Sequence, residues 1–81
     1  MTPDVGIRFK AAALTLGLTA KQIEFLFRVA SGQTQAKVAY KLNIKDPSGS
    51  LSRAYEKLGA QHRGHAISIV FEQALREAGL K

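Results

Sequence analysis

The stretch TQAKVAYKLNIKDPSGSLSRAYEKL, residues 34–58, decides the fold, because it holds two short runs with helical apolar spacing separated only by residues 43–45. In the first run, Thr34 can cap a helix that extends to about Leu42, and Asn43 is the expected stop. The buried side of this helix is predicted to consist of Ala36, Val38, Ala39 and Leu42.

The second run begins with Asp46 and Pro47, a strong signal for the start of a helix. An Asp side chain accepts hydrogen bonds from the free amides of a helix start, and Pro fits the first helical position without losing a bond. One side of the predicted helix packs through Leu51, Ala54, Tyr55 and Leu58, and the other presents Ser48, Ser52, Arg53 and Lys57 to solvent. Two short helices with so tight a turn predict a helix-turn-helix, whose second helix can enter the major groove of DNA.

Three further helices are predicted around this pair. One covers residues 3–16, a second covers residues 20–30 and begins with the capping-box pair Thr19 and Gln22, and the third covers residues 63–78. A chain of 81 residues has room for one domain, and strands have almost no support in it. The predicted fold class is therefore all-α, a small helical bundle that contains a helix-turn-helix.

The composition narrows the functional classes. Twelve Lys and Arg against six Asp and Glu give a net charge of +6, which favours nucleic acid or an anionic membrane surface as partner. The excess lies in the middle of the chain, at Lys37, Lys41, Lys45, Arg53, Lys57 and Arg63, opposed by Asp46 and Glu56. No cysteine is present, so a disulfide framework and a thiolate metal site are both excluded. No signal peptide or membrane-spanning run is found, and we expect a soluble, cytoplasmic protein.

A set of residues spread over most of the chain has the order and spacing of a known motif. These residues are Leu18, Thr19, Glu24, Leu26, Ala30, Gly32, Val38, Ala39, Leu42, Ile44, Lys57, Leu58, Gly59, Arg63 and Ala66. Through them the chain resembles the LuxR-type, or GerE-like, helix-turn-helix DNA-binding domain. The resemblance implies a LuxR-like domain of four helices over residues 18–81, preceded by an extra N-terminal helix over residues 1–17.

The recognition helix departs from the pattern of that family. The segment between Ile44 and Leu58 is about two residues shorter, at its start. Where the family has a Thr-Val-Lys run and a His, this chain has Asp46, Pro47, Ser48 and Ser50. The predicted DNA contacts are Thr34, Gln35, Lys37, Lys45, Ser48, Ser50, Ser52, Arg53, Lys57 and Arg63. Arg53 is the candidate for reading a base, because a guanidinium can pair with both acceptors of a guanine edge, whereas lysines mostly contact phosphate.

The last helix carries apolar residues over an arc too wide for one interface, and Ile69 and Phe71 cannot readily face the same core. The resemblance also implies pairing through this helix. The predicted dimer interface is Ala66, Ile69, Val70, Phe71, Gln73 and Ala74. The alternative is that the N-terminal helix covers this arc within one monomer.

The leading hypothesis is a sequence-specific transcriptional regulator that binds duplex DNA as a homodimer, either as a stand-alone protein or as a fragment of a larger one. The alternative is an interaction protein that keeps the fold but binds a partner regulator. A third hypothesis, an RNA-associated or ribosome-associated protein, rests on charge alone. No catalytic arrangement stands out, and we expect neither an enzyme nor a cofactor. His62 and His65, without a nearby carboxylate or Cys, are typical of surface or capping groups rather than of a metal site.

Overall fold

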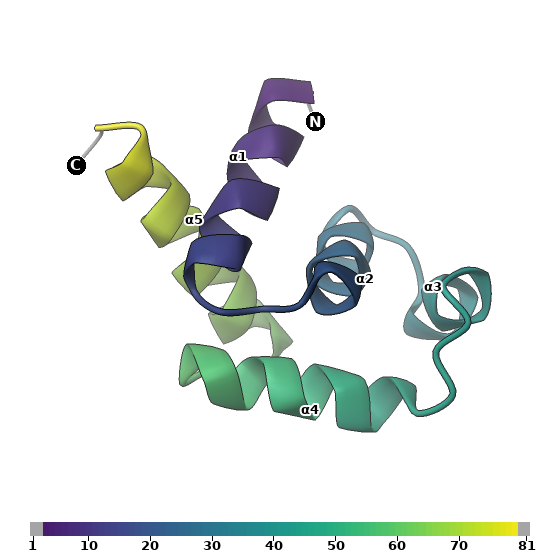
Figure 1. The fold of residues 1–81 in the computed structure, drawn as a ribbon. Helices are drawn as coiled ribbons and strands as arrows, with labels where there is room; N and C mark the ends of the chain where they lie inside the picture. The colour runs from purple at the N-terminus through teal and green to yellow at the C-terminus, as the bar shows by residue number, and fades with distance from the viewer. Residues whose placement is uncertain (1–2, 80–81) are drawn as a thin grey trace.

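The computed structural model describes residues 3–79 and folds them into five helices joined by short connections (Figure 1). The helices are α1 (Pro3–Thr15), α2 (Ala20–Ala30), α3 (Gln35–Lys41), α4 (Pro47–Leu58) and α5 (Arg63–Glu77). No strand occurs within these described residues. The predicted all-α class is therefore confirmed, and each helix lies within one or two residues of its predicted bounds.

The residues predicted to start helices do so through side-chain hydrogen bonds. Thr19 Oγ1 accepts from the Gln22 amide at 3.2 Å, and Gln22 Oε1 accepts in return from the Thr19 amide at 3.0 Å. Thr34 Oγ1 accepts from the Lys37 amide at 3.3 Å at the start of α3. These bonds satisfy amides that have no partner inside the helix, so polar residue types alone fix where α2 and α3 begin.

Two helix ends depend on residues that tolerate the left-handed backbone conformation. Gly59 adopts a φ of 71° directly after α4, and its amide donates to the carbonyl oxygens of Glu56 and Tyr55. Asn43 adopts a φ of 56° between α3 and α4 and is the one described non-glycine residue with positive φ. Gly and Asn pay the smallest steric cost in this region, which is why the chain turns at these positions.

The larger of two hydrophobic cores lies where α1 packs against α5 and α2. Phe9 is fully buried at its centre, and its ring lies 5.6 Å from the ring of Phe27 and 5.3 Å from that of Phe71. Gly6 is buried beside it, and an added Cβ would lie 3.2 Å from Cζ of Phe27. The glycine in the first turns of α1 therefore permits a close approach to α2.

This packing corrects the predicted dimer interface. Ala66, Val70 and Ala74 are buried inside the monomer, and Val70 and Ala74 belong to the same core as Phe9 of α1. A residue already buried in the monomer has no surface left for a second copy. The alternative that the N-terminal helix covers the apolar arc of α5 holds for Val70 and Ala74, because α1 contributes its own apolar side to their core.

The second core joins α2 to the helix-turn-helix pair α3 and α4. Its buried members are Phe25, Val29, Val38, Ala39 and Leu51. Tyr55 of α4 packs against both cores and links them. Ala36 was expected in this core but is exposed, because its position on α3 is turned well away from that of Val38. Within residues 3–79, no helix is long and apolar enough to cross a bilayer.

Candidate nucleic-acid interface

The outer side of α4 is a short polar surface. Gly49, Ser52, Arg53 and Glu56 follow one another at helical spacing, which places them on one face. Ser52, Arg53 and Glu56 are exposed, and so are Ser48 and Lys57 on either side of them. Four predicted DNA contacts, Ser48, Ser52, Arg53 and Lys57, are thus brought together on a surface open to a partner.

Ser50 is a wrong prediction as a DNA contact. Ser50 is only 8% exposed, because it lies one helical turn before Ala54, which is fully buried in the core. The inward side of α4 therefore includes this serine, and Ser50 cannot reach a base or a phosphate while the helix stays packed.

The first turn of α4 is already occupied by a carboxylate of the chain itself. Asp46 Oδ1 accepts from the Gly49 amide at 3.1 Å. An added Cβ at Gly49 would collide with that carboxylate, so the glycine is needed for the cap. Helix starts attract anions through their free amides, but here Asp46 fills that role and adds a negative charge at the start of α4.

The charge of α4 itself is small. The helix carries Arg53 and Lys57 against Glu56, and Asp46 precedes it, so this segment is close to neutral. The positive charge predicted for the middle of the chain is therefore not carried by α4 itself. The positive charge instead surrounds α4: Lys37 and Lys41 lie on α3, Lys45 lies in the connection, and Arg63 begins α5.

Three cations elsewhere in the molecule have carboxylate partners, while Lys21 of α2 has none within the described residues. Lys10 Nζ lies 3.3 Å from Glu24 Oε2, Arg28 lies 3.5 Å from the other oxygen of the same carboxylate, and Arg76 lies 2.7 Å from Glu72. By contrast, none of five cations around α4 makes an ion pair within the described part of the chain. These five are Lys37, Lys41, Lys45, Arg53 and Arg63. Uncompensated positive charge is therefore concentrated on the helix-turn-helix side.

Lys57 has a partner in the scaffold. Its ammonium donates to Gln22 Oε1 at 3.4 Å, so it links α4 to the capping box of α2. Sequence analysis predicted a phosphate contact for Lys57 but not this bond, because nothing in local spacing relates two residues so far apart in the chain. Gln22 is buried and Lys57 exposed, so the lysine can leave Gln22 without burying a charge.

The remaining predicted contacts lie at helix starts. Thr34 is exposed and engaged as a cap, Gln35 is half-buried in the first turn of α3, and Arg63 is exposed at the start of α5. Arg63 also influences Tyr55, because burial raises the pKa of the Tyr55 phenol while the positive charge of Arg63 opposes that rise.

The two histidines are capping groups. His62 Nδ1 accepts from the His65 amide at 3.2 Å, and His65 Nδ1 accepts from the Gln61 amide at 3.2 Å. His62 therefore caps α5, and the His65 side chain satisfies the amide of Gln61, the residue before that cap. No group of three or more potential metal-ligating side chains occurs among residues 3–79.

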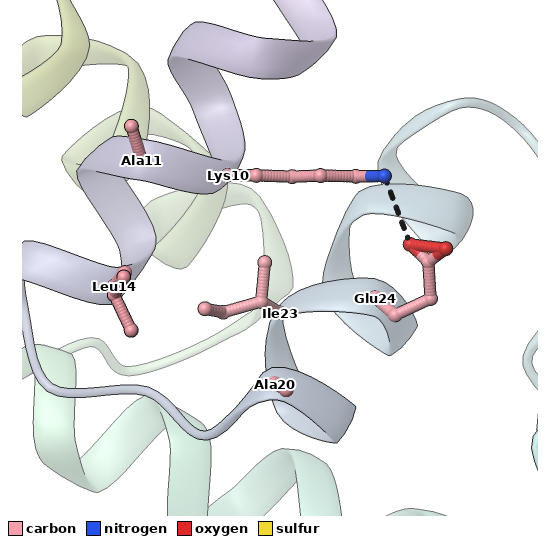
Figure 2. A pocket seen from close by; sticks show the side chains of 6 residues that line it. All are labelled: Lys10, Ala11, Leu14, Ala20, Ile23 and Glu24. Carbon is pink, nitrogen blue, oxygen red and sulfur yellow. Dashed lines mark ion pairs between the residues drawn. The ribbon is translucent and has the colours of Figure 1, made fainter.

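An open hollow lies between α1 and the first turns of α2, away from the five unpaired cations around α4 (Figure 2). It is lined by Lys10, Ala11, Leu14, Ala20, Ile23 and Glu24. The Lys10–Glu24 ion pair crosses one side of it, and the other side chains are apolar. None of the predicted DNA contacts lines it.

Two exposed residues of α3 were not among the predicted contacts. Tyr40 is 88% exposed, and Lys41 follows it directly. The signal was present in the sequence, because the spacing that buries Val38 and Ala39 turns the next two residues outward.

No family model, no curated protein and no solved structure matches the chain. The resemblance to the LuxR-type domain therefore stays an expectation drawn from the residues quoted above.

Proposed function

We propose that this protein binds duplex DNA with the helix-turn-helix formed by α3 and α4, and that it acts as a transcriptional regulator. The observation that supports the proposal best is the placement of the unpaired cations. Lys37, Lys41, Lys45, Arg53 and Arg63 gather on and beside these two helices, whereas Lys10, Arg28 and Arg76 on other helices lie beside the carboxylates of Glu24 and Glu72. Phosphate contacts supply most of the affinity of such domains for DNA, so the cations beside α4 can anchor it although α4 is almost neutral.

Base reading would rest on Arg53. It projects from the middle of the exposed side of α4, with Ser52 beside it. A guanidinium can bind both acceptors of guanine in the major groove, while a serine hydroxyl accepts or donates to any base and discriminates little. We therefore propose one strongly specified position per binding site. A dimer would place two α4 helices about one duplex turn apart, and the half-buried edge of α5 at Ile69 and Gln73 is the part of the predicted interface left open to it.

A titration of a fluorescently labelled random duplex at two salt concentrations tests the proposal. We expect binding at low salt that weakens steeply as the salt concentration rises. The logarithm of the binding constant should fall with the logarithm of the salt concentration, with a slope of about −0.9 for each phosphate neutralised. Arg53→Ala should flatten the preference for one base position in a selection from random duplexes, whereas Lys45→Ala should weaken all sequences alike. Absence of binding at low salt contradicts the proposal and favours the interaction protein, which has little affinity for DNA.

A further inference from the structure

Tyr40 is an aromatic side chain that the fold leaves in water. It is 88% exposed, against 67% for Ile7 and 64% for Leu14, and it belongs to neither core. Within residues 3–79 it makes no ring contact and no side-chain hydrogen bond. Tyrosine combines a large apolar ring with a polar hydroxyl, and such residues are enriched where a partner covers them.

The charged residues near Tyr40 on α3 are all lysines. Lys37 lies one turn before it and Lys41 directly after it, both exposed, and α3 contains no acidic residue. Lys45 follows in the connection to α4. None of these lysines has an ion pair in the described chain. The outer side of α3, formed by Lys37, Tyr40 and Lys41, is thus complementary in charge to a polyanion.

The shape of this surface favours the backbone of a duplex over unpaired bases. It is the convex side of a single helix of seven residues, so it offers no groove in which several bases could be splayed and stacked. A tyrosine hydroxyl can donate to a phosphate oxygen, and lysines attract the same groups. In helix-turn-helix domains the first helix crosses the sugar-phosphate backbone while the second lies in the groove.

Tyr40 lies near the end of α3 that is joined to α4. Only residues 42–46 separate the two helices (Figure 1), and both contribute to the second core, α3 with Val38 and α4 with Leu51. The C-terminal end of α3, which carries Tyr40 and Lys41, therefore leads directly into the start of the proposed recognition helix.

We infer that Tyr40 and Lys41 contact the sugar-phosphate backbone of the duplex whose groove α4 occupies, with the Tyr40 hydroxyl donating to a phosphate oxygen. This inference rests on the proposed DNA binding and extends it to the outer side of α3. The partner is defined by its chemistry, a double-stranded polyanion, and the contact adds affinity without adding sequence preference.

The absence of tryptophan allows a direct test. The chain has two tyrosines, so the Tyr55→Phe variant emits tyrosine fluorescence from Tyr40 alone. Tyr55 is half-buried and packs through its ring, which phenylalanine retains. We expect random duplex to change this emission over the same concentrations that produce binding of a labelled duplex. Tyr40→Phe, which lacks only the hydroxyl, should weaken binding by about tenfold at low salt.

Matched controls separate this contact from general effects. Ile7→Ala truncates an exposed apolar side chain on α1, and it should leave duplex affinity unchanged. Lys41→Ala should weaken the salt dependence of the binding constant by the amount that corresponds to about one phosphate contact.

The outcomes distinguish the two proposals. Duplex binding that leaves the emission of Tyr40 and the affinity of Tyr40→Phe unchanged overturns the inference while the proposed function stands. No duplex binding by any variant removes both. Tighter binding of single strands than of duplex, with quenching of Tyr40, overturns the backbone contact and assigns the surface to unpaired bases.

Discussion

The ammonium of Lys57 in α4 and the side-chain oxygen Oε1 of Gln22 in α2 lie 3.4 Å apart, and that oxygen also accepts the amide of Thr19 at 3.0 Å. The capping box of the scaffold helix and a residue of the proposed DNA surface thus share one acceptor. Gln22 keeps its hydrogen bond to Thr19 when Lys57 moves away. The lysine can therefore exchange Gln22 for a phosphate at small cost to the stability of the fold. The bond orients Lys57 toward the scaffold in the free protein.

The capping box gives the first prediction. Gln22→Ala removes the bond to Thr19 and the acceptor of Lys57, and should lower the free energy of unfolding by about 1 kcal/mol or somewhat more. Thr19→Ala should cost about 1 kcal/mol as well. The double variant should cost less than the sum, because both residues belong to one reciprocal pair. Urea denaturation measures all three, with Lys21→Ala as an exposed neighbour that should change little. Fully additive losses would show that the two bonds are independent.

The second prediction concerns the carboxylate at the start of α4. Asp46→Asn should keep the cap, since asparagine serves as well as aspartate at this position, while removing a negative charge beside the proposed groove contact. We expect duplex affinity at low salt to rise about fivefold, from a Coulomb energy of about 1 kcal/mol at close range in water. Anisotropy titrations measure the change. Asp46→Ala is the comparison: it should bind DNA with a similar gain but unfold more easily by about 1 kcal/mol. An unchanged affinity in Asp46→Asn would place the duplex away from this end of α4.

The third prediction tests whether α1 belongs to the main core. Phe9 is fully buried between Phe27 and Phe71, so Phe9→Ala should lower the free energy of unfolding by about 3–5 kcal/mol. Ile7→Ala on the same helix should change it by no more than about 0.5 kcal/mol, because Ile7 is 67% exposed. Equal effects in a thermal or urea melt would mean that α1 is not packed as described.

The local features of this fold follow from the sequence because they depend on neighbouring residues. Thr19, Thr34 and Asp46 cap the helices that their spacing predicts, and Gly59 and Asn43 end or separate helices where a left-handed residue is needed. Each of these choices involves residues within one turn of each other, so residue type and order are sufficient.

The errors concern contacts between distant residues. Ser50 was predicted as a DNA contact through its match to the LuxR-type pattern, but the packing of α4 turns it inward with Ala54. Val70 was given to a second copy of the chain, because the sequence alone cannot show that Phe9 of α1 reaches it. The hydrogen bond between Lys57 and Gln22 was not predicted for the same reason, because the two residues lie far apart in the sequence. The rotation of a helix about its axis and the choice of partner for an apolar arc are settled only when the helices pack.

The fourth prediction concerns pairing of the chain. Ile69 is half-buried and lies outside both cores, whereas Phe71 packs edge-on against Phe9. Ile69→Glu should therefore leave the fold intact and, if the edge of α5 joins two copies, reduce the mass measured by light scattering to that of one 8.8 kDa chain. Phe71→Glu should instead unfold the protein, because a carboxylate would replace a ring in the core. A wild-type chain that already measures as a monomer at high concentration would end the dimer proposal.

The fifth prediction concerns stability in alkali. Burial raises the pKa of Tyr55 above 10.0, and the positive charge of Arg63 limits that rise. Above pH 10.0 the unfolded chain therefore loses this proton before the folded chain does, so the folded state binds more protons. The part of the stability that depends on the neutral phenol is complete below pH 10.0 and is lost as the pH rises through the folded pKa.

Phenolate absorbance in the Tyr40→Phe variant follows Tyr55 alone and should show its ionisation at a higher pH than that of a free tyrosine. Arg63→Gln removes the opposing charge and should move the ionisation higher still, because burial then acts without compensation. In parallel, Tyr55→Phe should lose less stability than the wild type between neutral pH and strong alkali, since it has no phenol to titrate at this position. An unchanged ionisation of Tyr55 in Arg63→Gln would show that the guanidinium does not act on this phenol.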